Sequence, residues 1–278
     1  IAPKNILVTA GIESDRVSPQ WLKKCHELAD KIIVVSKHSK DSFLNTKVKV
    51  MGPDGSPMDY VLTKPVEVAG YPVKKFNKTT LNLDLEHNFN FLCNLKNVLN
   101  EYEGAKCSVN LIHGYMNNDE IHSLYCHPKV KALINFTHGE GFGLPMFEAA
   151  YCALPIIAHD WGGQTDFLYA PKKDKKGKIK NRAFFVKVPY KLEPVQKNAV
   201  WDGVLQADSN WAYVSASGAK VAMRDMYKNY DVYHGQAKKL QKHILKEFAE
   251  EKQNENLLKC LEIFDLNTQQ EIDKLFNE

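Results

Sequence analysis

The first 45 residues alternate between short apolar runs and helix-like segments, and this order restricts the chain to few folds. Residues 5–9 and 31–35 are rich in Ile, Leu and Val and predict two buried strands. Between them, Ser18 suits a helix cap and Pro19 suits a first helical position, while Ser36 begins a shorter helix that reaches Phe43. The order strand, helix, strand, helix predicts a parallel α/β sheet.

A second α/β pattern follows a connector at residues 51–80 that is rich in Gly, Pro and Lys. Strand-like runs alternate with helix-like segments through the middle of the chain, and the residues from about 219 onward are mostly helical in pattern. The expected strands are 89–93, 108–112, 132–136 and 154–158, and the expected helices are 94–103, 118–125 and 145–152. Sheets of this kind bind ligands at the carboxyl ends of their strands.

Composition excludes several classes of protein. With 278 residues and 44% hydrophobic residues, the chain can bury a core without disulfides or metals. No apolar run approaches the roughly 20 residues that span a bilayer, and the first residues lack the pattern of a signal peptide, so we expect a cytoplasmic protein. The net charge of +4 is too small to imply a nucleic-acid partner by itself. The six cysteines include no Cys-x-x-Cys pair, which favours buried thiols over a zinc or disulfide framework.

The most informative segment is 134–168. A buried strand is followed by the loop Gly139-Glu140-Gly141-Phe142-Gly143, and Leu144-Pro145 then begins a helix. Glycines allow a backbone to approach a ligand closely, and a helix start offers unpaired N–H groups to an anion. Glu148 lies about one turn into the helix, so its carboxylate and that of Glu140 can face the same crevice. The loop lacks the Lys-Ser/Thr of a P-loop, which argues against a nucleotide triphosphatase.

This segment resembles the signature of the retaining glycosyltransferases of family 4, which have two facing Rossmann-like domains in the GT-B fold. The signature Glu-x₇-Glu stands here as Glu140-Gly141-Phe142-Gly143-Leu144-Pro145-Met146-Phe147-Glu148, and a Gly-Gly-x-x-acid turn follows at 162–166. Two weaker parts extend the resemblance, at 113–125 and at 13–36. The resemblance implies a GT-B-like α/β fold with an incomplete N-terminal domain. Its parts are a partial acceptor-side domain and linker at 1–76, a nucleotide-sugar-binding domain at 77–245 and a C-terminal helical segment at 246–278.

The resemblance also implies roles for individual residues. Glu148 would hold the donor ribose, and Glu140 would contact the transferred sugar as a catalytic residue. The backbone of residues 141–144 would hold the sugar and diphosphate, and Gly114 and Tyr115 would border the nucleobase. Glu13 is a second catalytic candidate, and Glu13, Asp15 and Arg16 are candidates for the acceptor side, with helix capping and ion pairing as an equally supported interpretation. The family needs no metal and no cofactor, because the nucleotide-sugar is a co-substrate.

The sequence also departs from the family. No Arg-Lys pair for the diphosphate follows residues 91–93, and a strand and helix are absent there. We favour the explanation that segments of a longer chain are omitted. A catalytically inactive GT-B module that binds a carbohydrate or a partner is the alternative to a hexosyltransferase-type enzyme, and the motif argues against a third candidate, a sugar-nucleotide epimerase. A glycan is the default acceptor and a modified DNA base is another.

The stretch from Lys172 to Arg182 carries seven basic side chains and a single acid, Asp174. Gly177 in its middle predicts a hairpin. A solvated loop is the favoured interpretation, because exposed lysine runs are common and no aromatic residues interleave with the lysines to stack on bases. Binding of a polyanion such as nucleic acid is the alternative.

Overall fold

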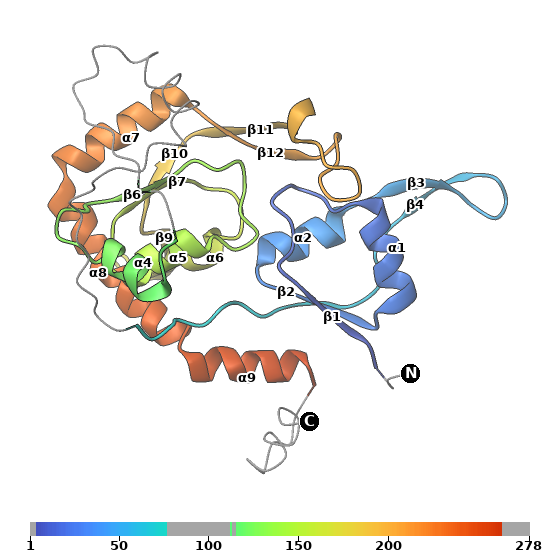
Figure 1. Cartoon of the computed structure of the whole chain (residues 1–278), viewed down its shortest axis with the longest axis horizontal. Coiled ribbons are helices and arrows are strands. Elements are labelled where there is room, and N and C mark those ends of the chain that lie inside the picture. The colour runs from blue at the N-terminus through green and yellow to red at the C-terminus, as the bar shows by residue number, and fades with distance from the viewer. Residues whose placement is uncertain (1–3, 77–111, 113–114, 263–278) are drawn as a thin grey trace, which may run out of the picture. The chain divides into compact units, whose positions relative to one another are not determined.

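The computed structural model describes residues 4–76, 112 and 115–262 (Figure 1). These residues belong to two compact units, Ile1–Lys74 with Lys131–Glu278, and Lys75–Val130. The larger unit contains two separate three-stranded parallel sheets. The expected α/β class is therefore confirmed, whereas the domain boundaries at residues 76 and 245 stay predictions.

The first sheet contains β1 (Ile6–Thr9), β2 (Lys31–Val34) and β5 (Val66–Val68) in the order β1-β2-β5. The helices between them are α1 (Pro19–Leu28) and α2 (Lys37–Asn45), and their N-caps are Ser18 and Ser36 as expected. Every residue of β2 is buried, since this strand is paired on both sides. A cluster that includes Leu22, Ile32 and Phe43 forms the core beside this sheet.

The second sheet contains β6 (Leu133–Asn135), β7 (Ile156–His159) and β10 (Val186–Val188) in the order β10-β7-β6. Helix α5 (Leu144–Tyr151) connects β6 to β7, and the one-turn helix α6 (Thr165–Leu168) follows β7. The carboxyl ends of β6 and β7 therefore lead into the two glycine-containing segments that the sequence singled out. This places both segments at the same edge of one sheet.

Three antiparallel hairpins extend from these sheets. They are β3 (Val48–Met51) with β4 (Pro57–Tyr60), β8 (Tyr169–Lys173) with β9 (Ile179–Ala183), and β11 (Tyr190–Pro194) with β12 (Asn210–Val214). The short helix η1 (Lys197–Ala199) lies in the last connection. The hairpin expected around Gly177 is confirmed. The connector expected at 51–80 is wrong in part, because it contains β4 and β5.

Three helices, α7 (Ala216–Lys228), α8 (Tyr230–Glu247) and α9 (Glu250–Cys260), complete the larger unit. The last of them returns to the first sheet, where Asn256 donates a hydrogen bond to the carbonyl oxygen of Val68 at 3.1 Å. Lys31 of β2 also donates to the carbonyl oxygen of Cys260 at 3.0 Å. The C-terminal helical segment thus stabilises the N-terminal sheet. None of the described helices is long and apolar enough to cross a membrane.

In the smaller unit the structure describes one helix, α4 (Asn118–Tyr125), as the sequence predicted. Asn117 and Glu120 form a reciprocal capping box, in which each side chain accepts a hydrogen bond from the other residue's backbone N–H. The helix and the strand expected at 94–103 and 108–112 lie outside the described residues, except for Ile112.

Candidate functional site

The loop that contains Glu140 ends at a helix with an uncapped N-terminus. Gly143 is the N-cap of α5 with φ of 92°, a left-handed conformation that favours glycine, and no side chain caps this helix end. Phe142 and Phe147 are buried against Phe167, with ring centroids 5.1–5.2 Å apart. The aromatic packing fixes the loop from its inner side. The helix N-terminus, with its partial positive charge, is therefore held in a defined place beside Glu140.

The carboxylate of Glu140 is fixed at the end of β6. Its Oε1 accepts hydrogen bonds from Asn135 Nδ2 at 3.2 Å and from Thr137 Oγ1 at 3.0 Å. Its carbonyl oxygen accepts a hydrogen bond from Gly163 N at 2.8 Å. Among the described residues, Oε2 of Glu140 has no hydrogen-bond partner, so this oxygen can accept from a bound hydroxyl group.

Glu148 lies on α5 with a side chain that is 18% exposed. Its Oε1 lies 3.6 Å from Nζ of Lys74, the last residue before the smaller unit. Because the separation is long and the Lys74 side chain is 47% exposed, this ion pair contributes little to stability, and a ligand that offers better donors can replace it. A ribose would have to displace Lys74 or share the carboxylate with it.

The glycines of the loop pack against the N-terminal part of the same unit. A Cβ added at Gly139 would lie 2.1 Å from the carbonyl oxygen of Glu13, and one added at Gly141 would lie 2.8 Å from that of Ala10. The carbonyl oxygen of Gly141 accepts hydrogen bonds from the hydroxyl groups of Ser36 and Ser39. The close approach that these glycines permit is therefore one between two backbone segments of the chain.

The Gly-Gly turn at residues 162–166 also contacts the N-terminal part of the larger unit. Asp166 Oδ2 accepts a hydrogen bond from Lys37 N at 2.8 Å, at the first turn of α2. Burial raises the pKa of the Asp166 carboxyl, while the hydrogen bond from the Lys37 amide acts in the opposite direction. The acid of the turn thus caps a helix that lies more than a hundred residues earlier in the chain.

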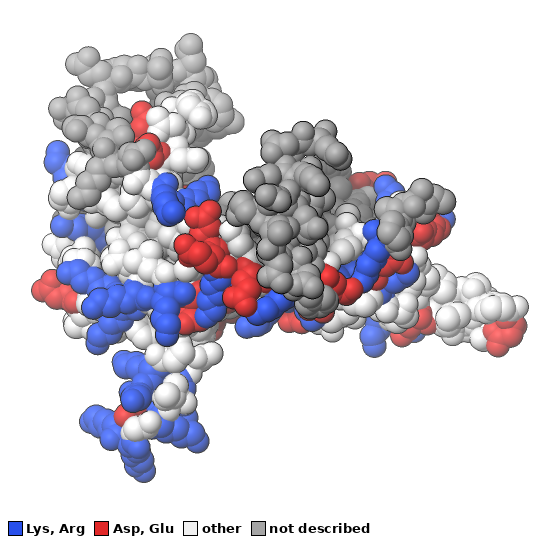
Figure 2. All heavy atoms as spheres, turned by 90° about the horizontal axis from the view of Figure 1, so that it is seen from below, with Lys and Arg blue, Asp and Glu red and all other residues white. Residues whose placement is uncertain are grey.

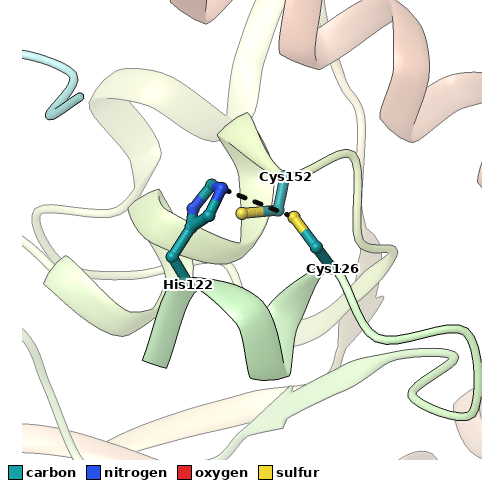
Figure 3. Close-up of side chains that lie close together, drawn as sticks. All are labelled: His122, Cys126 and Cys152. Carbon is teal, nitrogen blue, oxygen red and sulfur yellow. Dashed lines mark hydrogen bonds between the residues drawn. The ribbon is translucent and has the colours of Figure 1, made fainter. Parts of the chain in front are cut away.

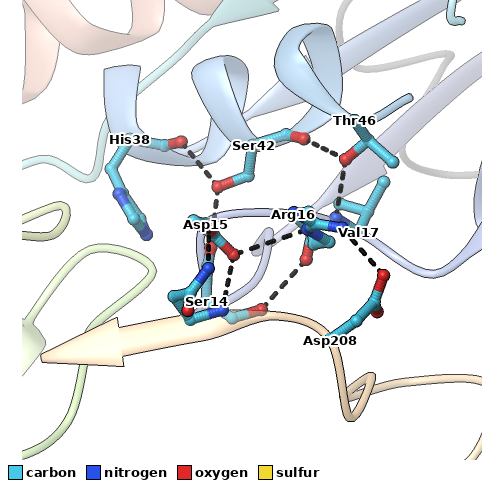
Figure 4. Close-up of polar contacts among 9 residues, drawn as sticks. Ser14, Asp15, Arg16, Val17, His38, Ser42, Thr46 and Asp208 are labelled. Atoms are coloured by element: carbon cyan, nitrogen blue, oxygen red, sulfur yellow. Dashed lines mark hydrogen bonds and ion pairs between the residues drawn. The ribbon is translucent and has the colours of Figure 1, made fainter. Parts of the chain in front are cut away.

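Two of the three acceptor-side candidates form structural contacts (Figure 4). Asp15 accepts hydrogen bonds from Asn210 N at 2.7 Å and from Asn210 Nδ2 at 2.9 Å. Arg16 donates to Asp208 Oδ2 at 2.8 Å. Glu13 is exposed at the start of this loop. Asp15 and Arg16 thus have the ion-pair contacts that one interpretation of the sequence expected, and the acceptor-side role of Glu13, Asp15 and Arg16 stays a prediction.

A cavity of about 420 Å³ lies between the loop that contains Asp15, helix α2 and the Gly-Gly turn. Its walls include Asp15, His38, Asp160, Trp161 and Asp166. His38 packs edge-on against Trp161 with ring centroids 4.7 Å apart, and burial lowers its pKa. Sequence reasoning missed His38, although its place two residues after the cap Ser36, at a strand end, was a usable signal.

His138 lies directly before the glycine loop, where its side chain could contact a substrate or pack at the strand end. Its ring stacks on Trp211 with centroids 4.5 Å apart, and its Nδ1 lies 2.8 Å from the carbonyl oxygen of Ala212. These contacts favour the packing role.

In the smaller unit, Tyr115 is 92% exposed, while Gly114 lies outside the described residues. His122 lies on α4, and Cys126, one turn later, is the C-cap of this helix. The distance between His122 Nε2 and Cys126 Sγ is 3.6 Å (Figure 3). Cys126 is exposed, which corrects the expectation that the cysteines are buried, whereas Cys25 and Cys260 are buried as expected.

No protein-family model matches the sequence, and no curated protein matches it significantly. Among solved structures, it is similar to a GtfA/B complex, with 13% identity and a TM-score of 0.44 over 93% of this chain and 52% of the other. It is also similar to the pneumococcal O-GlcNAc transferase GtfA in complex with UDP and GlcNAc, with 14% identity and a TM-score of 0.42 over 91% and 52% of the two chains. The chain spans about half the length of these structures.

Proposed function

We propose that the chain belongs to a glycosyltransferase that moves a sugar from a nucleotide-sugar donor to an acceptor with retention at the anomeric carbon. One observation carries the proposal. Glu140 lies in a loop that ends at the uncapped N-terminus of α5, and Glu148 lies on that helix, at the carboxyl end of a parallel sheet. This is the edge at which open α/β sheets bind ligands.

Each part of this arrangement suits a different part of a nucleotide-sugar. The N–H groups at the start of α5 and its partial positive charge suit the diphosphate, whose negative charge grows as it leaves. Oε2 of Glu140 suits a sugar hydroxyl. Glu148 suits the ribose hydroxyls once Lys74 is displaced. The chemistry in this proposal is positioning and charge stabilisation and uses no metal, and a glycan is the first acceptor to test.

The contact between Lys74 and Glu148 favours a second candidate, a GT-B module that binds a carbohydrate or partner without transfer. In that case the carboxylate keeps its ion pair and the donor site stays closed. The two candidates differ in whether the protein releases nucleoside diphosphate from any nucleotide-sugar.

The test is a screen of nucleotide-sugars for release of nucleoside diphosphate, followed by calorimetry with the nucleotide that reacts. Replacing Glu148 by Gln should weaken nucleotide binding by about 1–3 kcal/mol, or roughly 5- to 150-fold, because a charge-assisted hydrogen bond is lost. Replacing Glu140 by Ala should lower turnover more than nucleotide affinity, because Glu140 contacts the sugar.

Glu193→Gln, at an exposed position on β11, is the matched control and should leave both quantities unchanged. Failure of every donor to react would support the inactive module. Unchanged nucleotide affinity in Glu148→Gln would exclude the assigned ribose contact.

A further inference from the structure

The hairpin of β8 and β9 concentrates positive charge on an exposed two-stranded ribbon. Residues 171–182 are all exposed. Their single acid, Asp174, uses Oδ1 to accept hydrogen bonds from Lys176 N and Lys178 N, both at 2.9 Å, and so shapes the turn. Asp174 therefore shapes the turn, and its single negative charge is outnumbered by the seven cations of residues 172–182.

The pairing register brings like charges together. Lys172 lies directly opposite Lys180, and Arg182 lies two residues further along the same face. Like charges directly opposite one another destabilise an antiparallel pair. Within the described part of the chain, none of the seven cations from Lys172 to Arg182 forms an ion pair. An anion bound from outside would relieve this repulsion.

The same side chains surround a cavity of about 720 Å³. The charged residues of its walls are Lys172, Lys173, Asp174, Lys175, Arg182 and Lys187, and Gln236 of α8 lies beside them. Lys187 already pairs with Asp160, which leaves four cations and one acid, Asp174, around this hollow. Figure 2 shows Lys and Arg side chains dominating a projecting segment that carries little red, as the composition of this hairpin requires.

We propose that this hairpin is a binding surface for the phosphate backbone of duplex nucleic acid. A ribbon of five-residue strands extends roughly 16 Å, and the major groove of B-DNA, about 12 Å wide, admits a two-stranded β-ribbon. Residues 171–182 contain no aromatic side chain, so the bases of a single strand would find no stacking surface. Ile179 is the one large apolar residue among them, which is too little for insertion into a membrane surface. The proposal does not depend on glycosyl transfer.

The experiment measures the fluorescence anisotropy of a labelled 20-base-pair DNA duplex against protein concentration at several salt concentrations. The hairpin variant replaces Lys172, Lys173, Lys180 and Arg182 by Ser. The matched control replaces four exposed lysines elsewhere that form no ion pair in the described structure, Lys24, Lys47, Lys191 and Lys197. For four phosphate contacts, the slope of log affinity against log salt should fall in magnitude by about 3.6 in the hairpin variant. The parent chain should lose roughly 100-fold more affinity between 50 and 200 mM salt than this variant does.

A third variant with Arg at Lys172, Lys173 and Lys180 keeps the charge and should bind like the parent, which separates loss of charge from loss of fold. Absence of duplex binding by the parent at low salt would overturn the proposal. Equal losses in the hairpin and control variants would overturn it too, because they would indicate a general charge effect. Tighter binding to a single strand, or to vesicles of anionic lipid, would assign the hairpin to a different partner. Because donor hydrolysis is assayed separately, failure here leaves the proposed transfer reaction intact.

Discussion

Gly139 offers a sharp test of how the glycine loop is held. A Cβ added there would lie 2.1 Å from the carbonyl oxygen of Glu13, whereas real Cβ atoms essentially never come within 3.0 Å of another atom. Gly139 has no left-handed φ, so Gly139→Ala introduces a steric conflict and no backbone strain of its own. Both sides of the contact are backbone, and the two segments must separate by roughly 1 Å, at a cost typical of overpacking, about 1–3 kcal/mol.

The assay is thermal unfolding. For a chain of this size a loss of about 2 kcal/mol lowers Tm by roughly 4–8 °C. The control is Gly235→Ala, in the middle of α8, where an added Cβ meets nothing within 4 Å. That variant should gain up to about 1 kcal/mol, because alanine is the better helix former. If Gly139→Ala unfolds at the temperature of the parent chain, the two loops are not in contact as described, and the reasoning on the loop's glycines is wrong.

Two further predictions concern other contacts between the N-terminal part of the larger unit and its residues after 131. Asp15→Ala removes two hydrogen bonds to β12 and should lower the free energy of unfolding, measured by chemical denaturation, by about 2–3 kcal/mol. Asp208→Ala removes an ion pair whose carboxylate is 76% exposed and should lower it by less than about 1 kcal/mol. Equal losses in the two variants would contradict the structural contact described for Asp15. Asp166→Asn keeps an acceptor for the Lys37 amide and removes a carboxyl whose pKa burial raises. Because the folded state holds that proton more tightly than the unfolded chain, the parent's share of stability from this group is present at low pH and is lost as pH rises through the raised pKa. The free energy of unfolding of Asp166→Asn, relative to that of the parent, should therefore be higher at pH 7 than at pH 4. A difference that does not change with pH would refute the assignment.

Local signals predicted the helices well. Ser18 with Pro19 and Ser36 mark the starts of α1 and α2, and the start of α4 also follows its cap. Short strands were harder to predict. β5 has only three residues, and its assignment depends on pairing with β2, a partner that local periodicity does not reveal.

At the candidate site, the sequence predicted the motif residues but not their partners. Asp15 and Asn210, or Lys74 and Glu148, meet only after the sheets have formed, so spacing along the chain carries no sign of them. The glycines of the loop were interpreted as room for a ligand, whereas two of them make room for the backbone of residues 10–13. A glycine-rich loop fits either use, and only the tertiary structure distinguishes them.

The contacts of the Gly141 carbonyl also bear on the order in which the chain folds. Each parallel sheet is assembled from strands that are near neighbours along the chain, whereas Ser36 reaches Gly141 across 105 residues and Asp15 reaches Asn210 across 195. Closing long loops is entropically costly, so contacts between distant residues form late. The two sheets should therefore form first in a refolding experiment. The hydrogen bonds from the hydroxyl groups of Ser36 and Ser39 to the Gly141 carbonyl should form in a final, slower step. The candidate site around Glu140 would therefore be complete only after that step.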